Sequence, residues 1–108
     1  MTVTLINSFV VPADREEAFV GMWKGTCDHF VNAPGFIETR LHRNIGQNDT
    51  TFLFVNVALW ENVELYKAAF ENFSPAGRRI EGIEPHPGLY AVFAEMKAGG
   101  ELVLSSDA

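Results

Sequence analysis

One segment constrains the fold of this chain more than any other: residues 51–60, TFLFVNVALW. Successive side chains of a strand point to opposite faces of the sheet, and here both sets of alternating positions are largely apolar, with Asn56 as the exception in the middle. A strand that is apolar on both faces belongs in the interior of a sheet whose two faces are both covered. We therefore predict a central strand over this segment, with Asn56 and Trp60 on the same face.

Three further strands are predicted, either from runs of β-branched and aromatic side chains or from alternation: residues 3–11, 36–44 and 89–97. In the second of them, Ile37, Thr39 and Leu41 would share one face. A proline-rich break over residues 85–88 is expected to precede the last strand, because proline removes a ladder N–H.

Two helices are predicted between the strands. Asp14 is the expected N-cap of the first and Asn62 of the second, because a short side chain with an acceptor oxygen can bond the free N–H groups of a first helical turn. The first helix is expected to end at residues 32–35 (NAPG), where a proline and a glycine break the helical geometry. Side chains at helical spacing define the buried stripes: Phe19, Met22, Trp23, Thr26 and Phe30 in the first helix, and Tyr66, Ala69, Phe70 and Phe73 in the second.

Two smaller features complete the pattern. A Ser-Pro pair at residues 74–75 is typical of a helix start and predicts a short helix that carries Arg78 and Arg79. Two glycines separate a C-terminal tail, residues 99–108, from a single domain over residues 1–98. The apolar run of that tail is expected either to fray or to pair with the sheet edge of a neighbouring chain.

The predicted order β-α-β-β-α-β is that of the ferredoxin-like fold, an α+β architecture with both helices on one face of an antiparallel sheet. The other sheet face would then be exposed, although many of its positions are apolar, and a large apolar patch normally marks an interface or a ligand site. Two such sheets packed face to face would form a homodimer, a dimeric α/β barrel. We expect an apolar pocket in each subunit between its sheet and its helices.

Length and composition limit the classes of protein to consider. The chain has 108 residues, which favours one domain, and its formal net charge is −6 with no basic run longer than Arg78-Arg79. This balance argues against binding to nucleic acid or to an anionic membrane surface. Cys27 is the only cysteine, which excludes an intrachain disulfide and a cysteine-rich metal site. Because no signal-peptide or transmembrane pattern is present, a cytoplasmic location is expected.

Motifs for common cofactors are absent from the sequence. It contains no GxGxxG, GxxxxGK[ST], HExxH or GxSxG pattern, and its three histidines, at positions 29, 42 and 86, are far apart. We therefore expect the protein to work without a metal, flavin, haem or nucleotide.

Polar side chains inside apolar strands are the candidate site residues. A buried amide without hydrogen bonds costs about 1–3 kcal/mol, so Asn56 either bonds a neighbouring backbone group or serves a ligand. Trp60 carries an indole N–H with the same need when it is buried, and its alternative role is core packing. Asn7 is a third polar side chain in an apolar run, where an ordinary strand-edge position is the alternative.

Three pieces of the sequence resemble the antibiotic biosynthesis monooxygenase family, whose members are small dimeric proteins with the ferredoxin-like fold. They are PGF at 34–36, FLFVNVALWE at 52–61 and Tyr66 in the helix that follows. The resemblance extends over about residues 3 to 96. Within the family, the chain is most similar to cofactor-independent oxygenases that convert anthrone-type polyketides to quinones. The resemblance thus implies oxidation of a small electron-rich aromatic, of anthrone or hydroquinone type, by O2.

The same resemblance implies a set of site residues. Their implied roles are hydrogen-bond donation to a developing phenolate or peroxide by Asn56, Trp60 and Asn7, proton acceptance by His42, and binding of a second substrate oxygen by Tyr66 with Arg78 or Arg79. Each also has a structural alternative, which is core packing for the aromatic residues and a solvated surface position for the histidine and the arginines.

Two other functions fit the same fold. A haem-degrading monooxygenase would also use a first-strand asparagine, but that branch needs a histidine near the end of the second helix and a tryptophan within it. Residues 61–79 contain neither. A non-catalytic barrel that binds a small ligand would need only the apolar pocket and the dimer interface.

Overall fold

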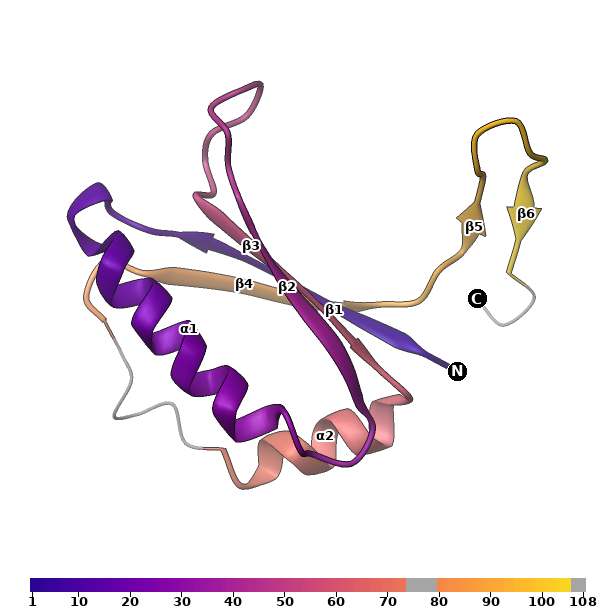
Figure 1. The fold of residues 1–108 in the computed structure, drawn as a ribbon, viewed down its shortest axis with the longest axis horizontal. Coiled ribbons are helices and arrows are strands. Elements are labelled where there is room, and N and C mark those ends of the chain that lie inside the picture. The colour runs from indigo at the N-terminus through magenta and orange to yellow at the C-terminus, as the bar shows by residue number, and fades with distance from the viewer. Residues whose placement is uncertain (74–79, 106–108) are drawn as a thin grey trace.

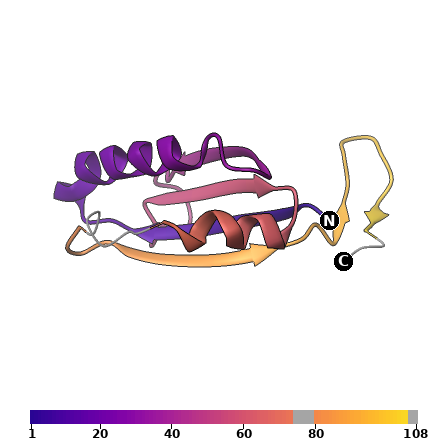
Figure 2. The same ribbon diagram turned by 90° about the horizontal axis from the view of Figure 1, so that it is seen from below.

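The computed structural model describes residues 1–73 and 80–105, and within them four antiparallel strands form one sheet in the order β2-β3-β1-β4. The strands are β1 (Val3–Val10), β2 (Phe36–Arg43), β3 (Phe54–Trp60) and β4 (Glu84–Tyr90). Two helices, α1 (Glu16–Phe30) and α2 (Val63–Glu71), lie on one face of the sheet (Figures 1 and 2). The predicted β-α-β-β-α-β order and one-sided helical layer are confirmed, and β3 is a central strand.

The core lies between the sheet and the helices as two apolar clusters. One contains Trp60 and Phe30, and the other contains Phe19 and Phe54. Trp60 is 1% exposed and Phe19 is fully buried. Burying such a side chain is worth about 1.5–3 kcal/mol, so the alternation of β3 and the stripes of the two helices account for the way these elements pack.

The two predicted helix starts have different outcomes. Asn62 caps α2, because its Oδ1 accepts the backbone N–H of Leu65 at 2.8 Å. The prediction for Asp14 is wrong: this residue lies inside a 3-10 turn, η1 (Ala13–Arg15), and α1 begins only at Glu16. The turn forms because the N–H of Arg15 bonds the Pro12 carbonyl at 2.9 Å.

A bulge in β2 changes which side chains face the core. The pairing of β2 with β3 is interrupted between Phe36 and Glu38. The extra residue moves Phe36 onto the helix side, where it packs against the core, and leaves Ile37 47% exposed. The prediction that Ile37 shares a face with Thr39 and Leu41 is therefore wrong at its first position.

The last strand of the sheet begins earlier than predicted. It starts at Glu84, ends at Tyr90 and includes Pro85 and Pro87, whereas the sequence predicts a break at these prolines and a strand over residues 89–97. Proline is tolerated here because β4 is an edge strand, which among the described strands pairs with β1 alone. The backbone N–H of His86, between the two prolines, bonds Asn7 Oδ1 at 3.0 Å.

Residues after β4 form a separate two-stranded hairpin, in which β5 (Ala94–Glu95) pairs with β6 (Val103–Leu104). The apolar run of the tail thus pairs within its own chain. In Figure 1 the hairpin rises beyond the end of β4, on the side of the sheet away from the helices. No helix among the described residues is long and apolar enough to cross a membrane.

Candidate active site

A hollow lies between the helices and the sheet. It has a volume of about 1030 Å³, and its walls are mainly apolar and aromatic. Phe9, Trp60, Phe70 and Phe73 are among the side chains that line it. The pocket predicted on the helix side of the sheet is therefore present, and its size suits a ligand of several fused rings.

Asn56 lies in this cavity with its amide oxygen held by two donors. Trp23 Nε1 of α1 donates to Asn56 Oδ1 at 3.1 Å, and Thr39 Oγ1 of β2 donates to the same oxygen at 2.6 Å. An indole N–H can only donate, so the oxygen of the amide must face Trp23. Because Asn56 lines the cavity and its amide nitrogen has no partner among the described residues, the nitrogen is the end of the amide left for a ligand.

Asn7 presents the same arrangement from the neighbouring strand. It pairs directly with Asn56 across β1 and β3, and its side chain also lines the cavity. Its Oδ1 accepts the N–H of His86, which leaves its NH2 group as a donor. The two asparagines therefore offer the cavity N–H groups, while their oxygens are engaged within the protein.

The indole of Trp60 is held by other rings. Phe30, Phe36 and Tyr66 contact it edge to face at centroid distances of 5.9, 5.3 and 5.7 Å. Its Nε1 is buried and has no acceptor among the described residues. Such an orphaned donor costs about 1–3 kcal/mol, which packing of the aromatic body has to offset.

Two titratable side chains in the cavity wall stay protonated at neutral pH. Burial raises the pKa of the Tyr66 phenol, so this group is available as a donor. Burial, together with the nearby Asp28 carboxylate, also raises the pKa of the Cys27 thiol. A thiol of raised pKa is a poor nucleophile, so Cys27 acts as a wall residue.

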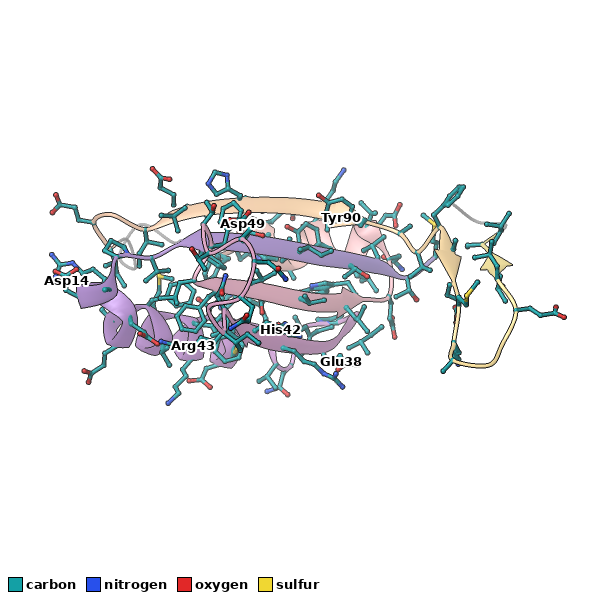
Figure 3. The ribbon with its side chains drawn as sticks, turned by 90° about the horizontal axis from the view of Figure 1, so that it is seen from above. Asp14, Glu38, His42, Arg43, Asp49 and Tyr90 are labelled. Atoms are coloured by element: carbon teal, nitrogen blue, oxygen red, sulfur yellow. The ribbon has the colours of Figure 1, made fainter. Side chains whose placement is uncertain are left out.

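The structure does not bring every predicted site residue into the cavity. His42 lies on the outer sheet face, the face that the helices leave uncovered, with its Nδ1 3.3 Å from the Val55 carbonyl oxygen. Figure 3 looks onto this face, where His42 and Glu38 follow β2. Glu38 forms an exposed ion pair with Arg40 at 3.3 Å. The predicted short helix at 74–79, with Arg78 and Arg79, lies outside the described residues.

Trp23 and Thr39 are the site residues that sequence reasoning missed. Helical spacing predicts only that Trp23 belongs to the buried stripe of its helix, and alternation only that Thr39 lies on one face of its strand. The available signal was chemical, because a partly buried indole N–H needs an acceptor, but nothing in the spacing identifies which one.

Two comparisons place the chain in a family. Residues 2–77 match the model of the antibiotic biosynthesis monooxygenases. The chain therefore belongs to this family, which confirms the predicted resemblance. A candidate monooxygenase from Shewanella loihica PV-4 has a similar structure, with 36% identity and a TM-score of 0.74, over 84% of this chain and 93% of that one. No curated protein sequence gave a match.

Two more distant structures share the fold. SnoaB, a cofactor-independent oxygenase from Streptomyces nogalater, is 24% identical with a TM-score of 0.69, over 84% of this chain and 92% of that one. MhuD, a haem degrader from Mycobacterium tuberculosis with two haems bound in its active site, is 22% identical with a TM-score of 0.64, over 88% and 99%.

The cavity residues do not fit a haem held by histidine. No histidine is among the described residues that line the cavity, and residues 74–79, SPAGRR, contain none. Within residues 1–73 and 80–105, no three His, Cys, Asp or Glu side chains gather closely enough to hold a metal ion.

Proposed function

We propose that this protein is a monooxygenase that oxidises a small electron-rich aromatic of anthrone or hydroquinone type with O2 and without a cofactor. The observation that carries the proposal is the Asn56 amide, whose oxygen is fixed by two donors so that its N–H groups face an apolar cavity. Fixed donors in a dry site stabilise negative charge that develops on a substrate oxygen.

The reaction needs only the substrate and O2. In an anthrone, the CH2 group opposite the ring carbonyl is acidic, and loss of one of its protons gives an anion whose charge lies on the carbonyl oxygen. The anion gives one electron to O2, and the resulting radical and superoxide combine and take up a proton to form a hydroperoxide. Elimination of water from the hydroperoxide breaks the O–O bond and leaves a carbonyl. Overall, one CH2 group and one O2 molecule are converted to one C=O group and one H2O molecule.

The chain contributes hydrogen bonds and shelter to this sequence. Asn56 and Asn7 donate to the oxyanion, and protonated Tyr66 holds a second oxygen of the substrate. The orphaned N–H of Trp60 gains an acceptor when a substrate oxygen approaches between the rings that cover it. Arg78 or Arg79 remains the proposed anchor from the segment after α2.

The proton of the substrate leaves toward the solvent-exposed margin of the cavity. His42 lies on the other sheet face and is not its acceptor in the same chain. Glu81 and Glu84 line the cavity at exposed positions, and these carboxylates are the described groups suited to take the proton.

Oxygen uptake tests the proposal. Anthrones supplied to the purified protein should consume one O2 per molecule, and with ¹⁸O2 one labelled oxygen should enter each product. A naphthohydroquinone should instead give its two electrons and two protons to one O2, forming the quinone and H2O2 with no label in the quinone. Asn56→Asp is the matched control, because a carboxylate keeps the acceptor for Trp23 and Thr39 but has no N–H to donate. Ligand binding without oxygen consumption would instead assign the protein as a small-molecule binding barrel.

We further propose that two copies associate through the outer sheet face. Ile6, Val55, Val57 and Leu59 lie on this face, which Figure 3 views with the two described helices behind the sheet. A second sheet packed against it would bury these apolar side chains and complete the α/β barrel.

A further inference from the structure

We infer that Trp23 and Thr39 are positioning residues that fix the Asn56 amide with its N–H groups toward the cavity. The inference rests on the proposed function of the cavity. It concerns two residues that do not themselves reach the reacting oxygen but determine which end of the amide does.

The two donors reach Asn56 from different elements. Trp23 belongs to α1 and Thr39 to β2, while Asn56 lies on β3. Their bonds of 3.1 and 2.6 Å converge on a single oxygen atom. If the amide turned over, its NH2 group would face the indole N–H, donor against donor, and the bond from Trp23 would be lost, while the Thr39 hydroxyl, which can also accept, would have to turn from donor to acceptor. The geometry therefore permits one orientation of the amide.

This orientation decides what charge the cavity favours. An amide turned the other way would present its oxygen to the ligand and would repel a phenolate or a peroxide. With the oxygen engaged, only N–H groups face the cavity at this position. The helix and the sheet together thus preorganise a donor, and the site needs no rearrangement as negative charge develops.

Other polar groups nearby do not share this task. The hydroxyl of Thr26, which also lines the cavity, donates to the Met22 carbonyl at 3.1 Å within α1. Thr26 therefore offers a matched control: it is the same residue type in the same wall, without a bond to Asn56.

The first experiment uses NMR of the ligand-free protein. The side-chain amide signals of Asn56 are assigned with Asn56→Ala, and the two indole N–H signals with Trp23→Phe. Thr39→Val should shift the Asn56 amide signals and the Trp23 indole signal, and Thr39→Ser, which keeps the hydroxyl, should restore them. Thr26→Val should leave the Asn56 signals in place. Asn56 signals that are the same in Thr39→Val and Trp23→Phe as in the parent would overturn the inference.

The second experiment measures the effect on a bound anion. A hydroxyanthraquinone changes colour when its phenol ionises, so its pKa in the cavity can be read by absorbance at saturating protein. Trp23→Phe and Thr39→Val should each weaken ionisation of the bound phenol by roughly 2- to 10-fold, the size expected for one lost hydrogen bond. Thr39→Ser should ionise the phenol as the parent does.

Turnover separates this inference from the proposed function. On a substrate that the parent oxidises, Trp23→Phe and Thr39→Val should lower kcat with little change in KM, and Thr39→Ser should recover it. If the parent oxidises no aromatic but the amide signals and the phenol pKa respond as expected, the proposed function fails and the positioning role stands. If the parent oxidises a substrate and both variants keep its kcat and the phenol pKa, the positioning role fails alone.

Discussion

The amide of Asn56 has two roles: its oxygen accepts hydrogen bonds from the protein, and its NH2 group is proposed to donate to the substrate. Two substitutions separate these roles. Asn56→Asp keeps an acceptor for Trp23 and Thr39 but loses the donor, so turnover should fall about 10²- to 10³-fold while the melting temperature stays near that of the parent. Asn56→Ala should lose the same turnover and about 1–3 kcal/mol of unfolding free energy as well, because the Trp23 N–H loses its acceptor. Turnover and thermal melts are measured on the same samples. Parent-like turnover in both variants would remove Asn56 from the site.

A substitution of Trp60 tests whether its indole N–H, which has no acceptor among the described residues, donates a hydrogen bond to the ligand. Trp60→Phe keeps an aromatic body among Phe30, Phe36 and Tyr66 but removes the N–H that has no acceptor. The loss of volume and the relief of the unpaired group oppose each other, so the melting temperature should change little. Turnover should fall by about 10-fold or more if the N–H bonds the substrate. A variant that melts lower and keeps its turnover would assign Trp60 to packing.

At this scale the sequence predicts which face a side chain takes but not its partner. Alternation along β3 places Asn56 and Trp60 on one face, as the structure confirms. The bond from Trp23 depends on how α1 is rotated and shifted over the sheet, which apolar spacing leaves open. His42 shows a conflict of signals, since alternation groups it with Arg40 on the polar face whereas the family resemblance implies a site role. The structure places it where alternation does.

Among the elements, β4 depends on Asn7 for one of its bonds to the sheet. Asn7→Ala should lower the unfolding free energy by about 0.5–1.5 kcal/mol, because the N–H of His86 loses its acceptor between two prolines. Asn7→Asp keeps an acceptor and should melt near the parent. Both variants lack the NH2 donor and should lose turnover alike. Urea unfolding measures the stability of each variant, and oxygen uptake measures its turnover. Normal turnover in Asn7→Asp would show that Asn7 serves only to hold β4 to β1.

The β5–β6 hairpin should contact the partner subunit. Phe93 is 66% exposed and Leu102 is 58% exposed, and the hairpin stands on the side of the sheet that the helices leave open (Figure 1). A second sheet on that face would meet both side chains. The double variant Phe93→Lys, Leu102→Lys should weaken dimerisation by at least about 10-fold, the effect of about 1.4 kcal/mol. The measurement is sedimentation equilibrium.

Val31 supplies the control for the hairpin. It is 58% exposed but follows α1 on the helix side, so Val31→Lys should leave the dimer unchanged. Equal weakening by this control, or no weakening by the hairpin variant, would show that the hairpin does not touch the partner.

Element boundaries are predictable where local chemistry decides them. Asn62 caps α2 because its backbone is extended and its side-chain oxygen reaches the free N–H of Leu65 in the first helical turn. The start of β4 is set by the sheet instead: prolines end an interior strand but are accepted at an edge, and a single sequence does not say which strand lies at the edge. The bulge in β2 likewise follows from how that strand meets β3, so the inward turn of Phe36 is not visible in its own alternation.

For the whole molecule, association through the outer sheet face predicts a mass of twice the 12.0 kDa of one chain. Light scattering behind size exclusion at micromolar concentration measures it directly. Val57→Asp should shift the population toward the monomer, because it places an unpaired charge in the middle of the buried face. A parent protein that elutes as a 12.0 kDa monomer would contradict the dimer.

Stability at alkaline pH should depend on the cavity wall. Burial raises the pKa of the Tyr66 phenol and of the Cys27 thiol in the folded state. The folded chain therefore holds these protons more tightly than the unfolded chain, and the resulting stabilisation is present at neutral pH and is lost as the pH rises through about 9 to 10 and above. The melting temperature should decline there, and less steeply in the double variant Tyr66→Phe, Cys27→Ala. An unchanged decline would show that other groups cause it.

The two edges of the sheet affect how the chain behaves when it is crowded with copies of itself. Exposed strand edges can recruit further strands, and repeated recruitment grows amyloid fibrils. On one edge, Pro85 and Pro87 lack the N–H groups that an incoming strand would need. On the other edge, Glu38 and Arg40 of β2 present charge to any strand that approaches. The two prolines, which the sequence alone predicts to interrupt a strand, thus hinder further strands from adding to this edge of the sheet and forming an aggregate.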